Sequence, residues 1–249
     1  MSTRTEAPAG ARRAGAERRA FAPPDPRGHL VPRRRLVRSL VRDDAHAVVA
    51  VSAQAGYGKS TLLAQWADAD PRPFAWITLG PHHDDPAVLV EEVVAAVDEV
   101  AGLDPGLLRV AMSGEPALST RVLPRLGRGL RAATAPFVLV LDDAHLLTSP
   151  RAHEVLWVIA TSLPPGAQLA LATRAAPPLR EQVLRTRRML RVLDGADLAM
   201  GEADAARLLA DAGVTATDAQ VRELVRATEG WPAGLYLGAL ALRERWPDG

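Results

Sequence analysis

Short apolar runs alternate with amphipathic segments along most of the chain, which predicts an α/β fold. Four runs dominated by aliphatic and β-branched residues are typical of strands buried on both faces of a parallel sheet. They span residues 47–53, 74–79, 137–141 and 168–174, and residues 187–193 are a possible fifth strand. Because helical segments separate these runs, we expect a parallel sheet with helices on both faces.

The segment 85–102 carries the strongest helical pattern. Asp85 can cap its N-terminus and Pro86 suits the first helical position. Apolar residues recur at helical spacing and form one stripe, made of Leu89, Val93, Val97 and Val100. We also expect helices over residues 60–70, 120–133 and 151–163.

The pattern becomes purely helical near the C-terminus. Helices are predicted over residues 201–213, 217–230 and 231–246, and Thr217 with Gln220 has the spacing of a capping box. The sequence thus predicts an α/β domain over residues 29–193 and a small helical domain over residues 194–249.

Composition excludes only a few classes of partner and site. The net charge of +1 gives no global field that would favour nucleic acid or a membrane surface, and no apolar run is long enough to span a bilayer. The absence of cysteine rules out disulfides and thiolate metal sites and fits a reducing compartment, so we expect a cytoplasmic location. Residues 1–28 are rich in Arg, Ala and Pro and are predicted to be disordered; their arginines either bind an acidic partner or are simply solvated.

The segment AQAGYGKS, residues 53–60, matches the phosphate-loop pattern except that Ala53 replaces the first glycine. It lies between a predicted strand and a predicted helix, where backbone N–H groups can converge on phosphate oxygens. Lys59 can reach the β- and γ-phosphates, and the Ser60 hydroxyl can bind Mg²⁺. The predicted nucleotide-binding residues of the loop are Ala55, Gly56, Tyr57, Gly58, Lys59, Ser60 and Thr61.

Lys59 is exceptional in this chain. The sequence holds 30 lysines and arginines together, and since Lys59 is the single lysine, 29 are arginines. A compact ammonium fits a loop wrapped around phosphates better than the planar guanidinium fork does. The surviving lysine therefore supports the phosphate-loop interpretation.

Asp142 and Asp143 directly follow the apolar run 137–141. Asp142 is the candidate Mg²⁺ ligand together with Ser60, and Asp143 is placed to orient or deprotonate an attacking water. Arg174 ends another predicted strand, at the edge of the sheet where ligands of open parallel sheets bind. It is therefore either a contact for the γ-phosphate or an ordinary surface arginine. His145 either contacts the two acids or merely begins the next helix.

Taken together, these motifs resemble the STAND class of P-loop ATPases, and within it the MalT-like, large LuxR-type transcriptional regulators. The resemblance covers about residues 30–245 and is carried by HLVPRRRLVRSL, VSAQAGYGKSTLLAQWA, FVLVLDDAHLL and RATEGWPAGLYLGALAL. It implies a P-loop NTPase fold of the ASCE or AAA-like type, an ATP or ADP ligand with Mg²⁺, and a small helical domain after the nucleotide-binding domain.

The resemblance also implies roles for particular residues. Val31 and Arg33 would border the adenine, and Arg174 would be the sensor arginine. Pro232 would belong to a Gly-x-Pro element that packs near the base and links nucleotide state to the helical part. In such proteins ADP holds a closed form, whereas ATP and an inducer open a form that self-associates.

The chain departs from this pattern because it stops at Gly249, with neither helical repeats nor a DNA-binding element in view. We therefore expect a fragment, or a protein whose partner functions lie on another polypeptide. The favoured function is an ATP-binding, slowly hydrolysing switch that serves regulation. The alternatives are a nucleotide-dependent scaffold without hydrolysis, and a P-loop small-molecule kinase in which LREQVLRTRRMLR would imitate a lid.

Overall fold

The computed structural model describes residues 21–24, 31–103 and 118–245 of the chain. Its centre is a five-stranded sheet in which every neighbouring pair is parallel, with the order β2-β3-β4-β1-β5. The strands are β1 (Val48–Ser52), β2 (Phe74–Thr78), β3 (Val138–Asp142), β4 (Gln168–Thr173) and β5 (Leu190–Leu193). The predicted α/β class and all five predicted strands are confirmed, and each strand end lies within three residues of its predicted position.

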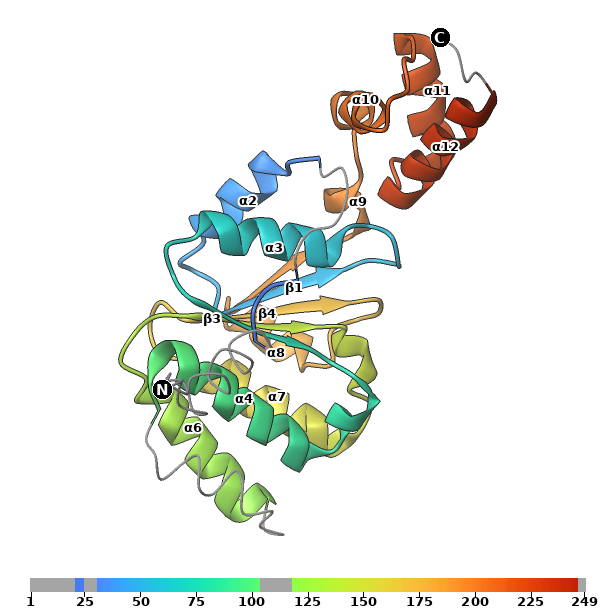
Figure 1. The fold of residues 1–249 in the computed structure, drawn as a ribbon. Helices are drawn as coiled ribbons and strands as arrows, with labels where there is room; N and C mark the ends of the chain where they lie inside the picture. Colours follow the sequence, from blue (N-terminus) through green and yellow to red (C-terminus); the bar gives the residue numbers. More distant parts are fainter. Residues whose placement is uncertain (1–20, 25–30, 104–117, 246–249) are drawn as a thin grey trace, which may run out of the picture.

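Helices cover both faces of this sheet (Figure 1). One face carries α2 (Arg34–Val41) and α3 (Lys59–Ala69), and the other carries α4 (Pro86–Ala101), α6 (Leu123–Arg131) and α7 (Pro150–Ser162). Alternate strand residues point to opposite faces, so Val49 packs with the α2–α3 layer whereas Val48 packs with the α4–α7 layer. This two-sided burial explains why the strands read as continuous apolar runs.

The helix starts follow the predicted capping chemistry. The Asp85 side chain accepts a hydrogen bond from the Ala87 N–H at 2.8 Å, at the start of α4. Thr217 and Gln220 form the predicted capping box at the start of α11, where the Thr217 N–H donates to Gln220 Oε1 at 2.8 Å. Local sequence therefore sets these helix boundaries.

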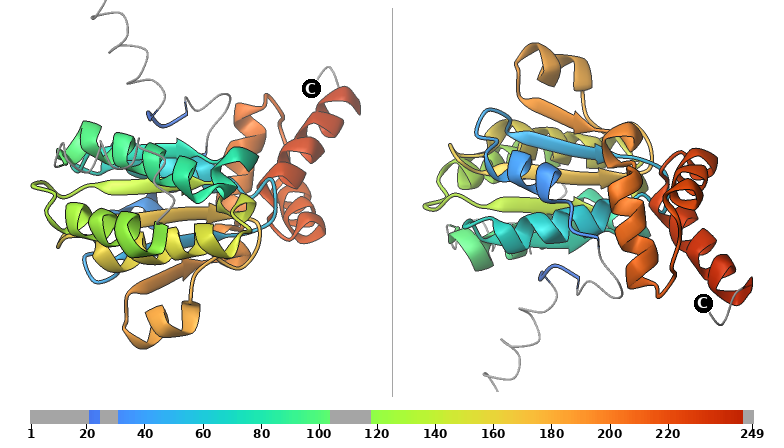
Figure 2. Two further views of the ribbon diagram at one scale, coloured as in Figure 1. Left: turned by 90° about the horizontal axis from the view of Figure 1, so that it is seen from below. Right: turned by 90° about the horizontal axis from the view of Figure 1, so that it is seen from above.

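The C-terminal part of the chain is helical. It contains α10 (Glu202–Asp211), α11 (Asp218–Thr228) and α12 (Pro232–Arg245), preceded by the short α9 (Gly195–Leu198). These helices lie beyond the carboxyl ends of the strands (Figure 2). They enclose a small apolar core that includes Leu208, Leu235 and, from the segment before α2, Val31.

Among the described residues, three α-helices were not expected from the sequence pattern: α2, α9 and α8 (Glu181–Thr186). α8 and α9 have six and four residues, too few for helical periodicity to show. In α2 the buried Leu36, Val37 and Leu40 do recur at helical spacing among the arginines, but this amphipathic signal spans only eight residues and was missed. Within the segment predicted to be disordered, the structure describes residues 21–24. Phe21 packs against the sheet core, and its carbonyl accepts a hydrogen bond from the Trp76 N–H at 3.0 Å. The remainder of that segment lies outside the described residues.

Candidate functional site

The loop between β1 and α3 has the geometry of a phosphate cradle. Gly56 and Gly58 adopt left-handed conformations, with φ of 80° and 77°, and Gly58 is the residue that caps α3. Glycine adopts such angles without the steric cost that a side chain adds. The loop therefore turns sharply into the helix N-terminus, where free N–H groups and the helix dipole favour a bound anion.

Lys59, the first residue of α3, lies within this loop and is only 8% exposed. Its Nζ donates hydrogen bonds to the carbonyls of Ala53 at 2.8 Å and Gln54 at 3.0 Å. Burial lowers the pKa of Lys59, and the positive charge of Arg174 lowers it further, against the opposite effect of Asp143 and Asp142 at the end of β3. The ammonium is thus held beside the loop by neutral acceptors, which a phosphate could replace.

Asp142 ends β3 and is buried, with 5% of its surface exposed. Desolvation by burial raises the pKa of this carboxyl. Hydrogen bonding with Ser60 lowers that pKa, and the negative charge of Asp143 raises it further. The Ser60 hydroxyl and the Asp142 carboxylate are close enough to affect the pKa of Asp142, and both are hard oxygen donors, the donor chemistry that Mg²⁺ prefers. The two residues predicted to hold the metal are therefore brought together.

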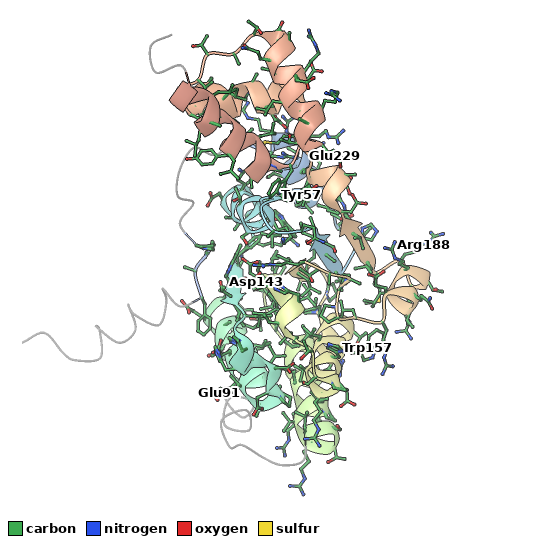
Figure 3. All side chains as sticks on the ribbon, turned by 90° about the vertical axis from the view of Figure 1, so that its right-hand side faces the viewer. Tyr57, Glu91, Asp143, Trp157, Arg188 and Glu229 are labelled. Carbon is green, nitrogen blue, oxygen red and sulfur yellow. The ribbon has the colours of Figure 1, made fainter. Side chains whose placement is uncertain are left out.

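Asp143 has an unusual backbone conformation, with φ of 58°, directly after the strand. A non-glycine residue in this region carries strain and is often found at functional sites. Asp143 is labelled in Figure 3, and its carboxylate lies 3.9 Å from Arg174 Nε and 3.7 Å from His145 Nδ1. The His145 Nδ1 atom is buried and has no hydrogen-bond partner among the described residues. The structure therefore gathers the predicted acid, the predicted arginine and His145 at one place.

The start of α12 lies against the phosphate loop. The Ala233 N–H donates to the Gly56 carbonyl at 3.1 Å, and the Trp231 indole Nε1 donates to the Ala55 carbonyl at 2.9 Å. A Cβ atom placed on Gly56 would lie 2.6 Å from Ala233 Cβ. The loop and the helix thus approach so closely that no side chain fits at position 56.

Sequence reasoning singled out the Gly230–Pro232 element but missed Ala233 as a loop contact. It also missed Gln65 of α3, whose side chain accepts from the Arg33 N–H at 2.7 Å and donates to the Val31 carbonyl at 3.2 Å. No local pattern marks either residue, because each acts on a segment distant in sequence.

Arg33 points toward the α9–α10 segment. Its guanidinium donates to the carbonyls of Leu198 at 2.7 Å and Ala199 at 3.2 Å. Burial lowers the pKa of Arg33, partly offset by the charge of Asp204. Val31 is buried in the small helical core. These two residues therefore connect the segment before α2 to the helical part, and their contact with a base stays a prediction.

Three of the five arginines in the stretch considered as a kinase-type lid make contacts with identified partners. Arg180 lies 5.1 Å from the centroid of the Trp157 ring on α7. Arg185 pairs with Glu181 at 3.4 Å, and Arg191 pairs with Asp43 at 3.0 Å. The Arg180 and Arg191 contacts anchor the stretch to α7 and to the segment after α2, whereas the Arg185 pair lies within α8.

Known proteins resemble this chain over most of its length. The transcriptional regulator MalT of Cronobacter sakazakii, described as an HTH-type regulator, is 29% identical over 219 residues, which are 87% of this chain and 24% of MalT. MalT of Yersinia enterocolitica is 29% identical over 218 residues, with the same coverage. The chain is thus similar to one part of the MalT-type regulators. It spans about a quarter of the length of these relatives. A comparison with models of protein families gives no match.

Solved structures of known ATPases share the fold of this chain. A STAND protein with a tetratricopeptide repeat sensor from Pyrococcus horikoshii has a TM-score of 0.59 at 17% identity, covering 86% of this chain and 30% of that one. A Walker-type ATPase of Pyrococcus abyssi has a TM-score of 0.54 at 16% identity, covering 90% and 72%. The chain therefore has the predicted P-loop ATPase fold. In the part of the chain that the structure describes, no helix combines the length and apolar character needed to cross a membrane.

Proposed function

We propose that this MalT homologue is an ATP-binding, slowly hydrolysing switch module of a LuxR-type transcriptional regulator. The observation that carries the proposal is the direct contact between the phosphate loop and α12, beside the Lys59, Ser60 and Asp142 cluster. A loop that served nucleotide binding alone would not need backbone hydrogen bonds to a C-terminal helix.

The residues of the loop suit a nucleoside triphosphate with Mg²⁺. The N–H groups from Ala55 to Thr61 would hold the phosphate oxygens, and Lys59 would exchange its loop carbonyls for the β- and γ-phosphates. Ser60 and Asp142 would hold Mg²⁺, which neutralises phosphate charge when bound. Val31, Arg33 and Pro232 stay the proposed neighbours of the adenine.

Hydrolysis requires a water held in line with the γ-phosphate. Asp143 would accept a proton from that water, and Arg174 would stabilise charge on the transferred group. In the structure these two side chains lie 3.9 Å apart and are partly exposed, with 36% and 51% of their surfaces accessible. An open, solvated pair of this kind fits slow turnover, which suits a switch.

The switch itself would act through α12. Binding of phosphates orders the loop, and the ordered loop presents the Ala55 and Gly56 carbonyls to Trp231 and Ala233. A ligand shifts a conformational equilibrium only by its difference in affinity for the two states. Nucleotides that hold the loop differently would therefore dock or release the helical part.

The wider role follows from the relatives, which are named as HTH-type transcriptional regulators. We propose that this module responds to an inducer of unknown chemistry and self-associates in its ATP state, in the cytoplasm. We place the DNA contacts of such regulators in the parts that this chain does not match, since the match covers about a quarter of the HTH-type relatives.

The proposal is tested by equilibrium binding of fluorescent ADP and ATP together with phosphate release under single-turnover conditions. Lys59→Ala removes a charge-assisted contact and should weaken binding at least about tenfold. Asp143→Asn should keep binding and slow phosphate release about 100-fold or more. Arg226→Ala and Glu223→Gln, which alter an exposed ion pair on α11, are charge-matched controls.

Two outcomes would contradict the proposal. Unchanged nucleotide affinity in Lys59→Ala would exclude the phosphate-loop site. Normal nucleotide binding with no phosphate release above background in the unaltered protein would instead identify a nucleotide-dependent scaffold.

A further inference from the structure

A second cluster of ligand-type side chains lies at the end of β2, apart from the phosphate loop. His82 and His83 belong to the turn η1 (Pro81–Asp84), and Glu92 lies on the following helix α4. The His83 Nε2 atom is 2.7 Å from Glu92 Oε2, and the His82 Nε2 atom is 3.9 Å from Glu92 Oε1. Among the residues that the structure describes, this is the one group whose three potential metal-binding atoms all lie within 4.8 Å of one another.

We propose that His82, His83 and Glu92 bind a first-row transition-metal ion, with Zn²⁺ as the best fit. Two imidazole nitrogens and one carboxylate oxygen are a common Zn²⁺ ligand set, and the fourth position is open to water. Mg²⁺ prefers oxygen ligands only, so this site and the proposed Mg²⁺ position at Ser60 and Asp142 differ in chemistry.

The distances are compatible with a tetrahedral site. Metal–ligand bonds of about 2.0–2.1 Å place neighbouring ligand atoms about 3.3 Å apart, between the two separations found here. His83 is fixed, since only 3% of its side chain is exposed. His82 and Glu92 are 63% and 36% exposed, so both can move by the fraction of an ångström to one ångström that coordination requires.

The other ring nitrogen of His83 lies against Gly80. In the structure the Gly80 N–H donates to His83 Nδ1 at 2.8 Å, so the ring proton is on Nε2 and is donated to Glu92 Oε2 at 2.7 Å. Metal binding at Nε2 would move this proton to Nδ1, where the Gly80 carbonyl, 3.2 Å away, would accept it in place of the present bond from the Gly80 N–H. Metal-binding histidines regularly donate this second N–H to a carbonyl or carboxylate, which fixes the ring.

A metal ion at this site would stabilise the connection between β2 and α4. The next residue of the turn, Asp84, accepts hydrogen bonds from the Thr148 and Ser149 N–H groups, each at 2.7 Å. Those residues follow the short helix that begins after Asp143. A metal at His82, His83 and Glu92 would therefore hold a turn that braces the loop carrying the acidic residues. Binding of the metal ion requires no nucleotide, so the metal site can be tested separately from the proposed switch.

The experiment is a zinc titration of the untagged protein by competition with a chromophoric zinc indicator, in buffer containing excess Mg²⁺. We expect one equivalent of Zn²⁺ to bind. His82→Gln and Glu92→Gln each remove one ligand at a partly exposed position and should weaken that binding at least about tenfold. Glu91→Gln makes the same charge change at an exposed neighbour on α4 and should bind like the unaltered protein. His83→Gln is avoided because the buried ring contributes to folding.

A melting experiment gives a second readout. Zn²⁺ that binds the folded state should raise the melting temperature of the unaltered protein and of Glu91→Gln, and should raise it less in Glu92→Gln. Absence of stoichiometric Zn²⁺ binding would overturn the proposal. Equal zinc affinity in all the variants would overturn it as well, because the metal would then be held elsewhere.

Discussion

The sheet and the start of α12 are held in place by different kinds of contact. The sheet is enclosed by two apolar layers, and β3 and β4 are buried at every residue. The start of α12 instead meets the phosphate loop through two hydrogen bonds to backbone carbonyls, from Trp231 and Ala233. One region rests on apolar burial, and the other on a few directional bonds.

This difference indicates which part of the molecule can change state. Burial of one large apolar side chain contributes about 1.5–3 kcal/mol, and the sheet layers bury dozens of side chains. A single neutral hydrogen bond contributes only about 0.5–1.5 kcal/mol net, since water can replace it. The contact between loop and α12 can therefore be made and broken at a cost that ligand binding can supply, whereas the sheet cannot be rearranged.

A pair of matched truncations tests this contrast with the largest expected effect. Leu139 of β3 and Leu235 of α12 are both fully buried, in the sheet core and in the helical core. Leu139→Ala should lower the free energy of global unfolding by about 2–5 kcal/mol, measured by urea denaturation. Leu235→Ala should speed amide exchange in α10–α12 and leave exchange in β1 and β4 nearly unchanged. Equal effects on both regions would show that the two parts form a single cooperative unit.

Gly56→Ala breaks the contact from the loop side. The substitution forces a side chain into a left-handed conformation, at a cost of about 1–3 kcal/mol, and its Cβ collides with Ala233. We expect lower stability and a more exposed Trp231, seen as a red shift in tryptophan fluorescence. A melting temperature and spectrum identical to those of the unaltered protein would mean that α12 does not rest on the loop.

Asp142→Asn tests the electrostatics of the site. We expect it to change the free energy of unfolding by about 1 kcal/mol. Burial raises the pKa of Asp142 in the folded protein, so the folded state holds this proton more tightly than the unfolded state does. The resulting stabilisation is complete below the unfolded-state pKa and disappears as pH rises through the folded-state pKa. At neutral pH the asparagine variant should therefore be more stable than the unaltered protein.

The advantage of Asp142→Asn should shrink as pH falls below the folded-state pKa, where the native carboxyl is protonated. Urea denaturation of both proteins between pH 4 and pH 8 measures this difference in the free energy of unfolding. A variant that is less stable at neutral pH, with no dependence on pH, would contradict the assignment of burial as the dominant cause.

The features predicted from the sequence are those with local signals. Apolar runs identified the strands, spacing identified the phosphate loop, and Thr217 with Gln220 identified a helix start. Asp142 was found because it follows a buried run directly. In each case the physical cause lies within a few residues of the feature.

The features that could not be predicted depend on contacts between distant segments. No local pattern shows that β4 lies between β1 and β3, or that Ala233 reaches Gly56. The left-handed conformation of Asp143 and the approach of His83 to Glu92 likewise arise from the packing of neighbouring elements. Such contacts need the fold, because chain direction and register decide which side chains meet.

The most direct test of a nucleotide-controlled contact is hydrogen exchange at the Ala233 amide, with and without ADP. This N–H is bonded to the Gly56 carbonyl, so its exchange reports the docking of α12 on the loop. With ADP at ten times its dissociation constant, protection of the peptide covering residues 228–238 should rise by up to about tenfold. Lys59→Ala should show no such rise. Unchanged exchange in the unaltered protein, under conditions where ADP is bound, would contradict the coupling between the phosphate loop and the helical segment.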